Sequence, residues 1–169
     1  MTTSDALIAE LRQEAEGTRR ALERVPEDKL AWRPHPKSMS LGELALHVAR
    51  VPGGVADLLD RSEAPAPDFS TRPEASSRAE LLAALEESIA GATSKLASWG
   101  DEGLGAEWRM TQDGETLLAL PRMAMTRAVM LNHWYHHRGQ LLVYLRLLDV
   151  PVPAIYGDSA DEPPTFARA

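Results

Sequence analysis

Three of the five histidines in this 169-residue chain fall within five positions of one another, and their spacing suits metal chemistry. On a helix, His133 and His137 lie one turn apart and project within about 40° of each other, whereas His136 lies about 60° from His133. A fourth histidine, His47, stands in the apolar stripe of another predicted helix. Three imidazoles from two helices could hold a divalent ion such as zinc, nickel or iron and leave positions open for water or substrate.

Spacing alone leaves a second interpretation open, because a single core-facing histidine is usually a hydrogen-bonded core residue. The pair is expected to face the core, and Arg138 to project away from it. Four residues share the side of the pair: Thr126, Met130, Leu141 and Tyr144. The chain has no HExxH sequence, so it lacks the glutamate of zinc peptidases of that type. It also has no cysteine, which excludes disulfides, thiolate ligands and a cysteine nucleophile.

The helix that should carry His47 has a clear start signal. Ser40 and Glu43 form a predicted capping box, in which each side chain accepts a hydrogen bond from the other residue's backbone N–H. Pro52 is expected to break or kink this helix, because it lacks an N–H and crowds the carbonyl of Val48. A continuation over 55–59 remains open.

Two further helices and the irregular segments are read from periodicity and turn residues. Apolar spacing predicts a helix over 4–24, and Ser77 with Glu80 predicts a second capping box that starts a helix ending near Gly100. The segment 62–75 shows no periodicity and is expected to be a loop.

The last third of the chain contains a hairpin and the longest helix. Asp113-Gly114 between two short apolar runs predicts a β-hairpin, and Pro121 opens a helix expected to run to about Leu148. The expected fold class is therefore all-α: a four-helix bundle with a short β-hairpin insertion before the last long helix, in one domain over 1–169.

Charge and hydropathy narrow the possible partners. Eighteen Lys and Arg against 25 Asp and Glu give a net charge of −7, which argues against nucleic-acid binding. No apolar run approaches the roughly 18 residues of a membrane span, and the first ten residues do not read as a signal peptide. We therefore expect a cytoplasmic protein with no membrane association.

Three stretches carry a family resemblance. Residues 32–44 read WRPHPKSMSLGEL and lead to His47, residues 133–141 read HWYHHRGQL, and residues 151–157 read PVPAIYG. In this order they closely resemble the DinB-like (damage-inducible, YfiT-related) superfamily, which is distinct from the error-prone DNA polymerase that shares the name. The resemblance implies an up-down-down-up four-helix bundle, a homodimer, and one divalent metal ion on His47, His133 and His137.

The resemblance also implies a type of chemistry. Related proteins include mycothiol or bacillithiol S-transferases and a thiol-dependent maleylpyruvate isomerase. We therefore predict a metal-dependent transferase that activates a low-molecular-weight thiol toward a small electrophile. The alternatives are a non-catalytic metal-binding stress protein and a hydrolase that uses a metal-bound water.

Residues close to the histidine triad in the sequence are assigned secondary roles, and no catalytic residue is identified. Glu43 is expected to be an exposed capping residue rather than a partner of His47, and Arg50 a surface cation. His35 and His136 are read as structural or rim residues. Tyr144 is read equally as a pocket or a core residue, and the four tryptophans as core or interface anchors.

Overall fold

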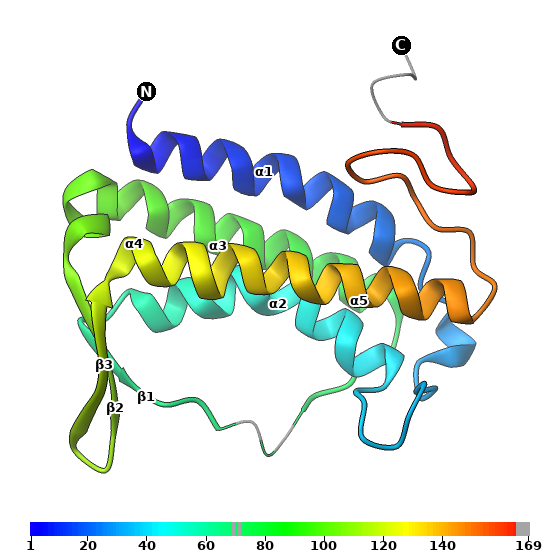
Figure 1. Cartoon of the computed structure of the whole chain (residues 1–169), viewed down its shortest axis with the longest axis horizontal. Helices are drawn as coiled ribbons and strands as arrows, with labels where there is room; N and C mark the ends of the chain where they lie inside the picture. Colours follow the sequence, from blue (N-terminus) through cyan, green and yellow to red (C-terminus); the bar gives the residue numbers. More distant parts are fainter. Residues whose placement is uncertain (69, 71, 165–169) are drawn as a thin grey trace.

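The computed structural model describes residues 1–68, 70 and 72–164. Within these residues the chain is mostly helical, with a small three-stranded sheet at one end (Figure 1). Helix α2 packs against α3 and α5, and α1 packs against α3. The long helices that form this body are α1 (Thr3–Leu22), α2 (Leu41–Leu59), α3 (Arg78–Gly105) and α5 (His133–Leu147). No helix among the described residues is long and apolar enough to cross a bilayer.

Helix α2 confirms the predicted capping box and the continuation over 55–59, so Pro52 does not break it. The Ser40 hydroxyl accepts from the Glu43 N–H at 3.1 Å, and the Glu43 carboxylate accepts from the Ser40 N–H at 2.7 Å. The helix nevertheless runs through Pro52 to Leu59. The carbonyl of Val48, which Pro52 cannot serve, accepts instead from the indole N–H of Trp134 at 2.8 Å. A contact from α5 therefore supplies the missing donor.

The start and end of α3 differ from the prediction in detail. Ser77 caps the helix by accepting from the Glu80 N–H at 3.1 Å, as expected. The Glu80 carboxylate, however, binds the N–H and hydroxyl of Ser76 rather than the backbone of Ser77, so the box is not reciprocal. Gly100 has a non-helical backbone with φ 54°, so the helix that begins at Arg78 ends there as predicted, and a further helical stretch, included in α3, runs on to Gly105.

The sheet contains the predicted hairpin and one strand that was not predicted. Strands β2 (Glu107–Gln112) and β3 (Glu115–Pro121) pair antiparallel, and Asp113 and Gly114 both have positive φ between them. Strand β1 (Glu63–Pro65) pairs parallel with β2, inside the segment expected to be an irregular loop. A three-residue strand is too short to show periodicity, and its pairing partner is distant in the sequence.

The last helical segment is one rod in Figure 1 but changes its winding along its length. It begins with the short helix α4 (Arg122–Met125), continues as a π-helix, η2 (Thr126–Asn132), and becomes α-helical at His133. The expected single α-helix over 121–148 is therefore wrong between 126 and 132. Residues 133–137 are regular α-helix, so the one-turn spacing of the histidine pair holds.

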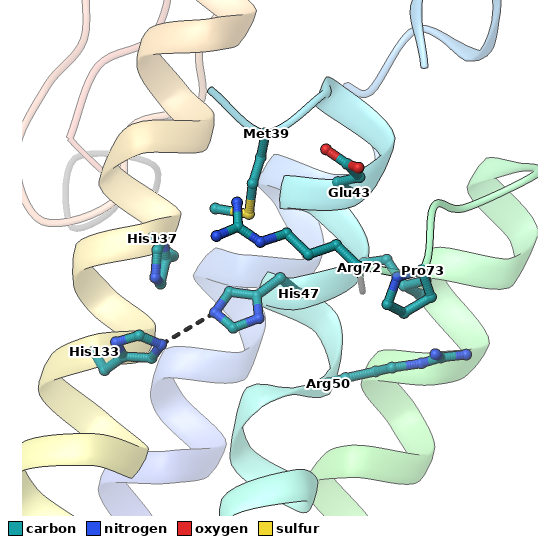
Figure 2. Close-up of a pocket in the computed structure, with 9 residues that line it drawn as sticks. Met39, Glu43, His47, Arg50, Arg72, Pro73, His133 and His137 are labelled. Carbon is teal, nitrogen blue, oxygen red and sulfur yellow. Dashed lines mark hydrogen bonds between the residues drawn. The ribbon is translucent and has the colours of Figure 1, made fainter. Parts of the chain in front are cut away.

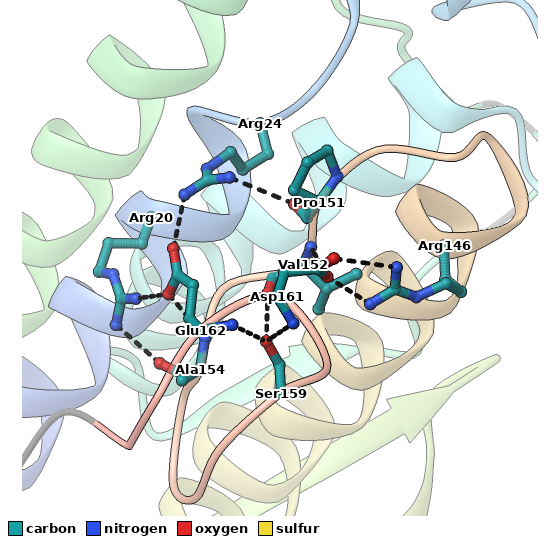
Figure 3. A network of polar contacts seen from close by, with 9 residues as sticks. All are labelled: Arg20, Arg24, Arg146, Pro151, Val152, Ala154, Ser159, Asp161 and Glu162. Atoms are coloured by element: carbon teal, nitrogen blue, oxygen red, sulfur yellow. Dashed lines mark hydrogen bonds and ion pairs between the residues drawn. The ribbon is translucent and has the colours of Figure 1, made fainter. Parts of the chain in front are cut away.

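Carboxylates hold the segment after α5 against the helices (Figure 3). Glu162 accepts from Arg20 and from Arg24, the latter at 2.6 Å. Asp161 accepts from Arg146, and these hydrogen bonds lower the pKa of Asp161. The segment contains no helix or strand among its described residues, but ion pairs hold it against the C-terminal ends of α1 and α5.

Candidate metal centre

Helices α2 and α5 bring the three predicted histidines together (Figure 2). His47 comes from the middle of α2, while His133 and His137 come from the first two turns of α5. One ring nitrogen from each lies within 4.8 Å of the other two, and the Nε2 atoms of His47 and His133 are 3.1 Å apart. The three rings are half-buried and pack edge to face.

The donor set fits a divalent metal ion. At zinc–nitrogen bond lengths of about 2.0–2.1 Å, two ligand nitrogens lie about 3.0–3.4 Å apart, which matches the His47–His133 separation. The same distance also suits a hydrogen bond between two neutral imidazoles. Burial, followed by the charges of neighbouring groups, lowers the pKa of His47 and of His137 to about 4, and burial lowers that of His133. Uncharged rings with free lone pairs at neutral pH are what metal ligation requires.

Gln140 fixes which nitrogen of His137 faces the site. Its side-chain oxygen lies 2.7 Å from Nδ1 of His137. Because a carbonyl oxygen only accepts, His137 donates Nδ1–H and keeps the lone pair on Nε2. Gln140 lies in the HWYHHRGQL stretch, but no role was predicted for it from the sequence. A polar side chain three residues after a predicted ligand was the available signal.

A buried hydrogen bond sets the two helices at matching heights. The Trp134 indole N–H donates to the Val48 carbonyl at 2.8 Å, and both residues are fully buried. His133 precedes Trp134 on α5, and His47 precedes Val48 on α2. The bond therefore places the two histidines opposite each other.

The triad opens into a cavity of about 280 Å³. Its remaining walls combine apolar side chains with arginines and one glutamate: Met39, Glu43, Leu46, Arg50, Arg72 and Pro73. Figure 2 shows Arg72 reaching across the cavity toward His47 and His137, while Arg50 extends away from them. The positive charge of Arg72 contributes to the lowered pKa of both histidines. Sequence analysis did not single out Arg72, because it lies in an aperiodic segment.

The other residues singled out in the sequence lie outside the cluster. Glu43 lines the cavity but is engaged in the capping box, and exposed Arg50 lies 3.8 Å from Glu80. Tyr144 donates its hydroxyl to the Met39 carbonyl at 3.3 Å. His136 is exposed on the flank of α5.

His35 lies in the exposed loop before α2, where its Nδ1 accepts from the Lys37 N–H at 3.1 Å. Two tryptophans, Trp108 and Trp134, are fully buried core residues, and the other two pack partly buried against the core.

The opposite side of α5 carries a polar cluster that sequence analysis missed. Arg138 projects away from the histidines, as expected, but it is only 2% exposed. It binds the Glu14 carboxylate at 2.6 Å and the Thr18 hydroxyl at 3.2 Å, both on α1. We call this group the α1–α5 polar cluster; its members are Glu10, Glu14, Thr18, Arg127, Tyr135, Arg138 and Tyr156.

The fold and the site together define a class of protein: mostly helical, with three imidazoles that converge on an open cavity. The sequence model of the DinB family matches residues 1–164, and the chain belongs to that family. The uncharacterized protein YrdA of Bacillus subtilis (strain 168) is 25% identical over 161 residues, which cover 95% of this chain and 92% of YrdA.

Solved structures share the fold. A DinB-like protein of Bacillus subtilis, YjoA, superposes with a TM-score of 0.67 at 21% identity, covering 88% of this chain and 95% of that one. A DinB-like protein of Bacillus cereus ATCC 10987 gives a TM-score of 0.68 at 22% identity, covering 90% and 97%.

Proposed function

We propose that His47, His133 and His137 bind one divalent metal ion, with zinc or nickel preferred and iron acceptable, and that the protein is a metal-dependent thiol transferase. The observation that carries this is the convergence of three neutral imidazoles on the wall of an open cavity. Among the described residues no carboxylate joins the cluster, so the bound ion would keep its charge and its open positions. Imidazole ligands suit these metals.

The chain's own residues would prepare the site for an incoming thiol. A bound cation lowers the pKa of a coordinated thiol and so supplies a thiolate at neutral pH. Because the chain has no cysteine, the thiol must arrive as a substrate. Gln140 holds His137 with Nε2 toward the site, and Met39 and Leu46 provide an apolar wall. In the transfer, the thiol would lose its proton to water, its sulfur would bond to the electrophilic carbon, and the leaving group would depart with the bonding electron pair.

One observation counts against a hydrolase that uses a metal-bound water. Glu43, whose carboxylate belongs to the cavity wall, already accepts from the Ser40 N–H. A hydrolase with a metal-bound water would gain most from a general base, and Glu43 is poorly placed to serve as one. Thiol transfer depends less on such a base, because the ion itself favours the deprotonated thiol.

Elemental analysis followed by a thiol-dependence screen tests the proposal. The purified protein should contain one zinc, nickel or iron ion per chain, and consumption of an electrophile such as an alkyl halide should require added thiol. Consumption without thiol would favour a hydrolase. A metal-loaded protein inert to all thiol and electrophile pairs would favour the non-catalytic candidate.

We also infer the finer arrangement and assembly that the family resemblance suggests. In Figure 1, α1 and α5 run in one direction and α2 and α3 in the other, which supports the up-down-down-up order. A cytoplasmic homodimer is the proposed state, as the family resemblance suggests. The net charge of −7 supports the expectation that it does not bind nucleic acid. Light scattering should give twice the chain mass of 18.5 kDa, and a monomer would contradict this.

A further inference from the structure

Arg72 is a cation of the cavity wall whose role the proposed function leaves open. Its side chain reaches across the cavity toward His47 and His137 (Figure 2). In the part of the chain that the structure describes, it makes no ion pair and no hydrogen bond. Its guanidinium, with donors arranged in a planar fork, is therefore available to a ligand in the cavity.

Contacts on the C-terminal side of Arg72 hold it close to the start of α2. The Glu74 carboxylate accepts from the buried hydroxyl of Ser40, and the Ala75 N–H donates to the Gly42 carbonyl at 3.4 Å. A side chain at Gly42 would place its Cβ 2.7 Å from Cγ of Glu74, so this close approach requires glycine. The attachment begins two residues after Arg72 and keeps it at the cavity.

The neighbouring arginines differ from Arg72 in having carboxylates beside them. Arg50 lies 3.8 Å from Glu80, and Arg33 lies 3.8 Å from Glu43. An imidazole that binds a metal carries no charge, so a divalent ion and Arg72 together would give this end of the cavity a positive charge that one thiolate does not balance. A ligand with a second anionic group would balance it.

We propose that Arg72 binds a carboxylate of the ligand, so that the cavity selects small thiols carrying both a sulfur and a carboxylate. The proposal rests on the proposed function, because the sulfur is placed on the ion held by the histidines. A guanidinium and a carboxylate match as two parallel N–H···O bonds, which adds orientation as well as charge. The carboxylate would fix the far end of the thiol while the sulfur faces the electrophile.

Cobalt-loaded protein provides a test that does not depend on turnover. The protein is titrated with 3-mercaptopropionate and with 3-mercaptopropanamide, which has the same length but no charge. The near-ultraviolet absorption of a cobalt–thiolate bond reports binding of each. We expect the wild type to prefer the acid by about fivefold, the upper end for a solvent-accessible ion pair. Arg72→Met should abolish this preference and leave the amide affinity unchanged, and Arg72→Lys should retain part of it.

Arg50→Met is the matched control, because Arg50 lines the same cavity but extends toward Glu80. It should keep the preference for the acid, and the cobalt content of every variant is measured alongside. Equal affinities for the two thiols in cobalt-loaded wild type, or an unchanged preference in Arg72→Met, would overturn the carboxylate site alone. A wild-type protein that binds no cobalt would overturn the proposed metal site and this inference with it.

Discussion

The two sides of α5 use polar residues in opposite ways. Toward α2, His133 and His137 meet His47 with ring nitrogens that converge on a cavity. Toward α1, Arg138 and its partners in the α1–α5 polar cluster bond to one another. The histidines line a cavity, whereas the members of the α1–α5 polar cluster bond to one another.

The difference teaches how to tell a site from a structural network. A buried charge is stable only when paired and hydrogen-bonded, and Arg138 is held by the carboxylate and the backbone carbonyl of Glu14. The histidines avoid the same penalty by being neutral. The converging neutral imidazoles keep lone pairs that can bind a cation. In the α1–α5 polar cluster, the charged groups are already paired with one another, so the cluster cannot accept a cation.

Breaking the α1–α5 polar cluster should have the largest effect. Arg138→Met leaves the Glu14 carboxylate without its principal partner, so we expect a loss of about 3–5 kcal/mol in the free energy of unfolding. Urea denaturation followed by circular dichroism measures it. The double variant Arg138→Met, Glu14→Leu should recover much of the loss. A single variant as stable as the wild type would show that the network is not structural.

Removing a histidine should have a large effect on metal and a small one on folding. His47→Ala, His133→Ala and His137→Ala should each lose most of the bound ion, because two ligands remain. His136→Ala is the control and should keep it, since His136 is exposed on the flank of α5. Elemental analysis of the four variants after identical purification decides. Equal metal content in His136→Ala and His137→Ala would contradict the site.

A smaller effect on metal affinity is expected at Gln140, on the side of α5 that carries the histidines. Gln140→Ala removes the acceptor of the His137 Nδ1–H, and we expect metal affinity to fall by about 10- to 100-fold. Gln140→Glu keeps an acceptor oxygen and should retain the affinity. Competition with a fluorescent chelator measures both variants. No change in the alanine variant would mean that Gln140 does not orient the ring.

A further prediction concerns the pH dependence of the metal-free protein. The pKa values of His47 and His137 are about 4 in the folded chain, below the ordinary value of 6.5. The unfolded chain therefore binds more protons between these values, and stability should fall as pH drops from 6.5 to about 4. Urea denaturation in EDTA across this range measures it.

The double variant His47→Asn, His137→Asn should flatten this dependence, while the control His136→Asn should not. An equally steep profile in the double variant would assign the dependence to groups other than the histidine cluster.

Local signals and the family resemblance each contributed to the candidate site. The spacing of His133 and His137 and the apolar stripe around His47 placed them on two predicted helices, and the resemblance named the three as one ligand set. The Ser40–Glu43 box was predicted because both partners lie within one turn. At Ser77 the same pattern was only half right, because Ser76 supplied the competing donors for Glu80.

Features made by distant contacts could not be predicted in this way. The Arg138 charge suggested exposure, since nothing in the sequence showed that Glu14 would face it. Arg72 lies in a segment without periodicity, and only its attachment to the start of α2 brings it to the cavity. The π-helix over 126–132 was not predicted, and nothing near Pro52 in the sequence showed that a donor from another helix would replace its missing N–H.

That replacement makes two positions depend on each other. Pro52 has no N–H to offer the Val48 carbonyl, and Trp134 donates to it. In Pro52→Ala the carbonyl would gain a backbone donor, so the indole would become redundant as a hydrogen-bond partner. A tryptophan at 134 is thus worth most in a chain that has proline at 52. In evolution or in design, the two residues should be exchanged together, because changing either alone alters how α2 and α5 are joined beside the histidines.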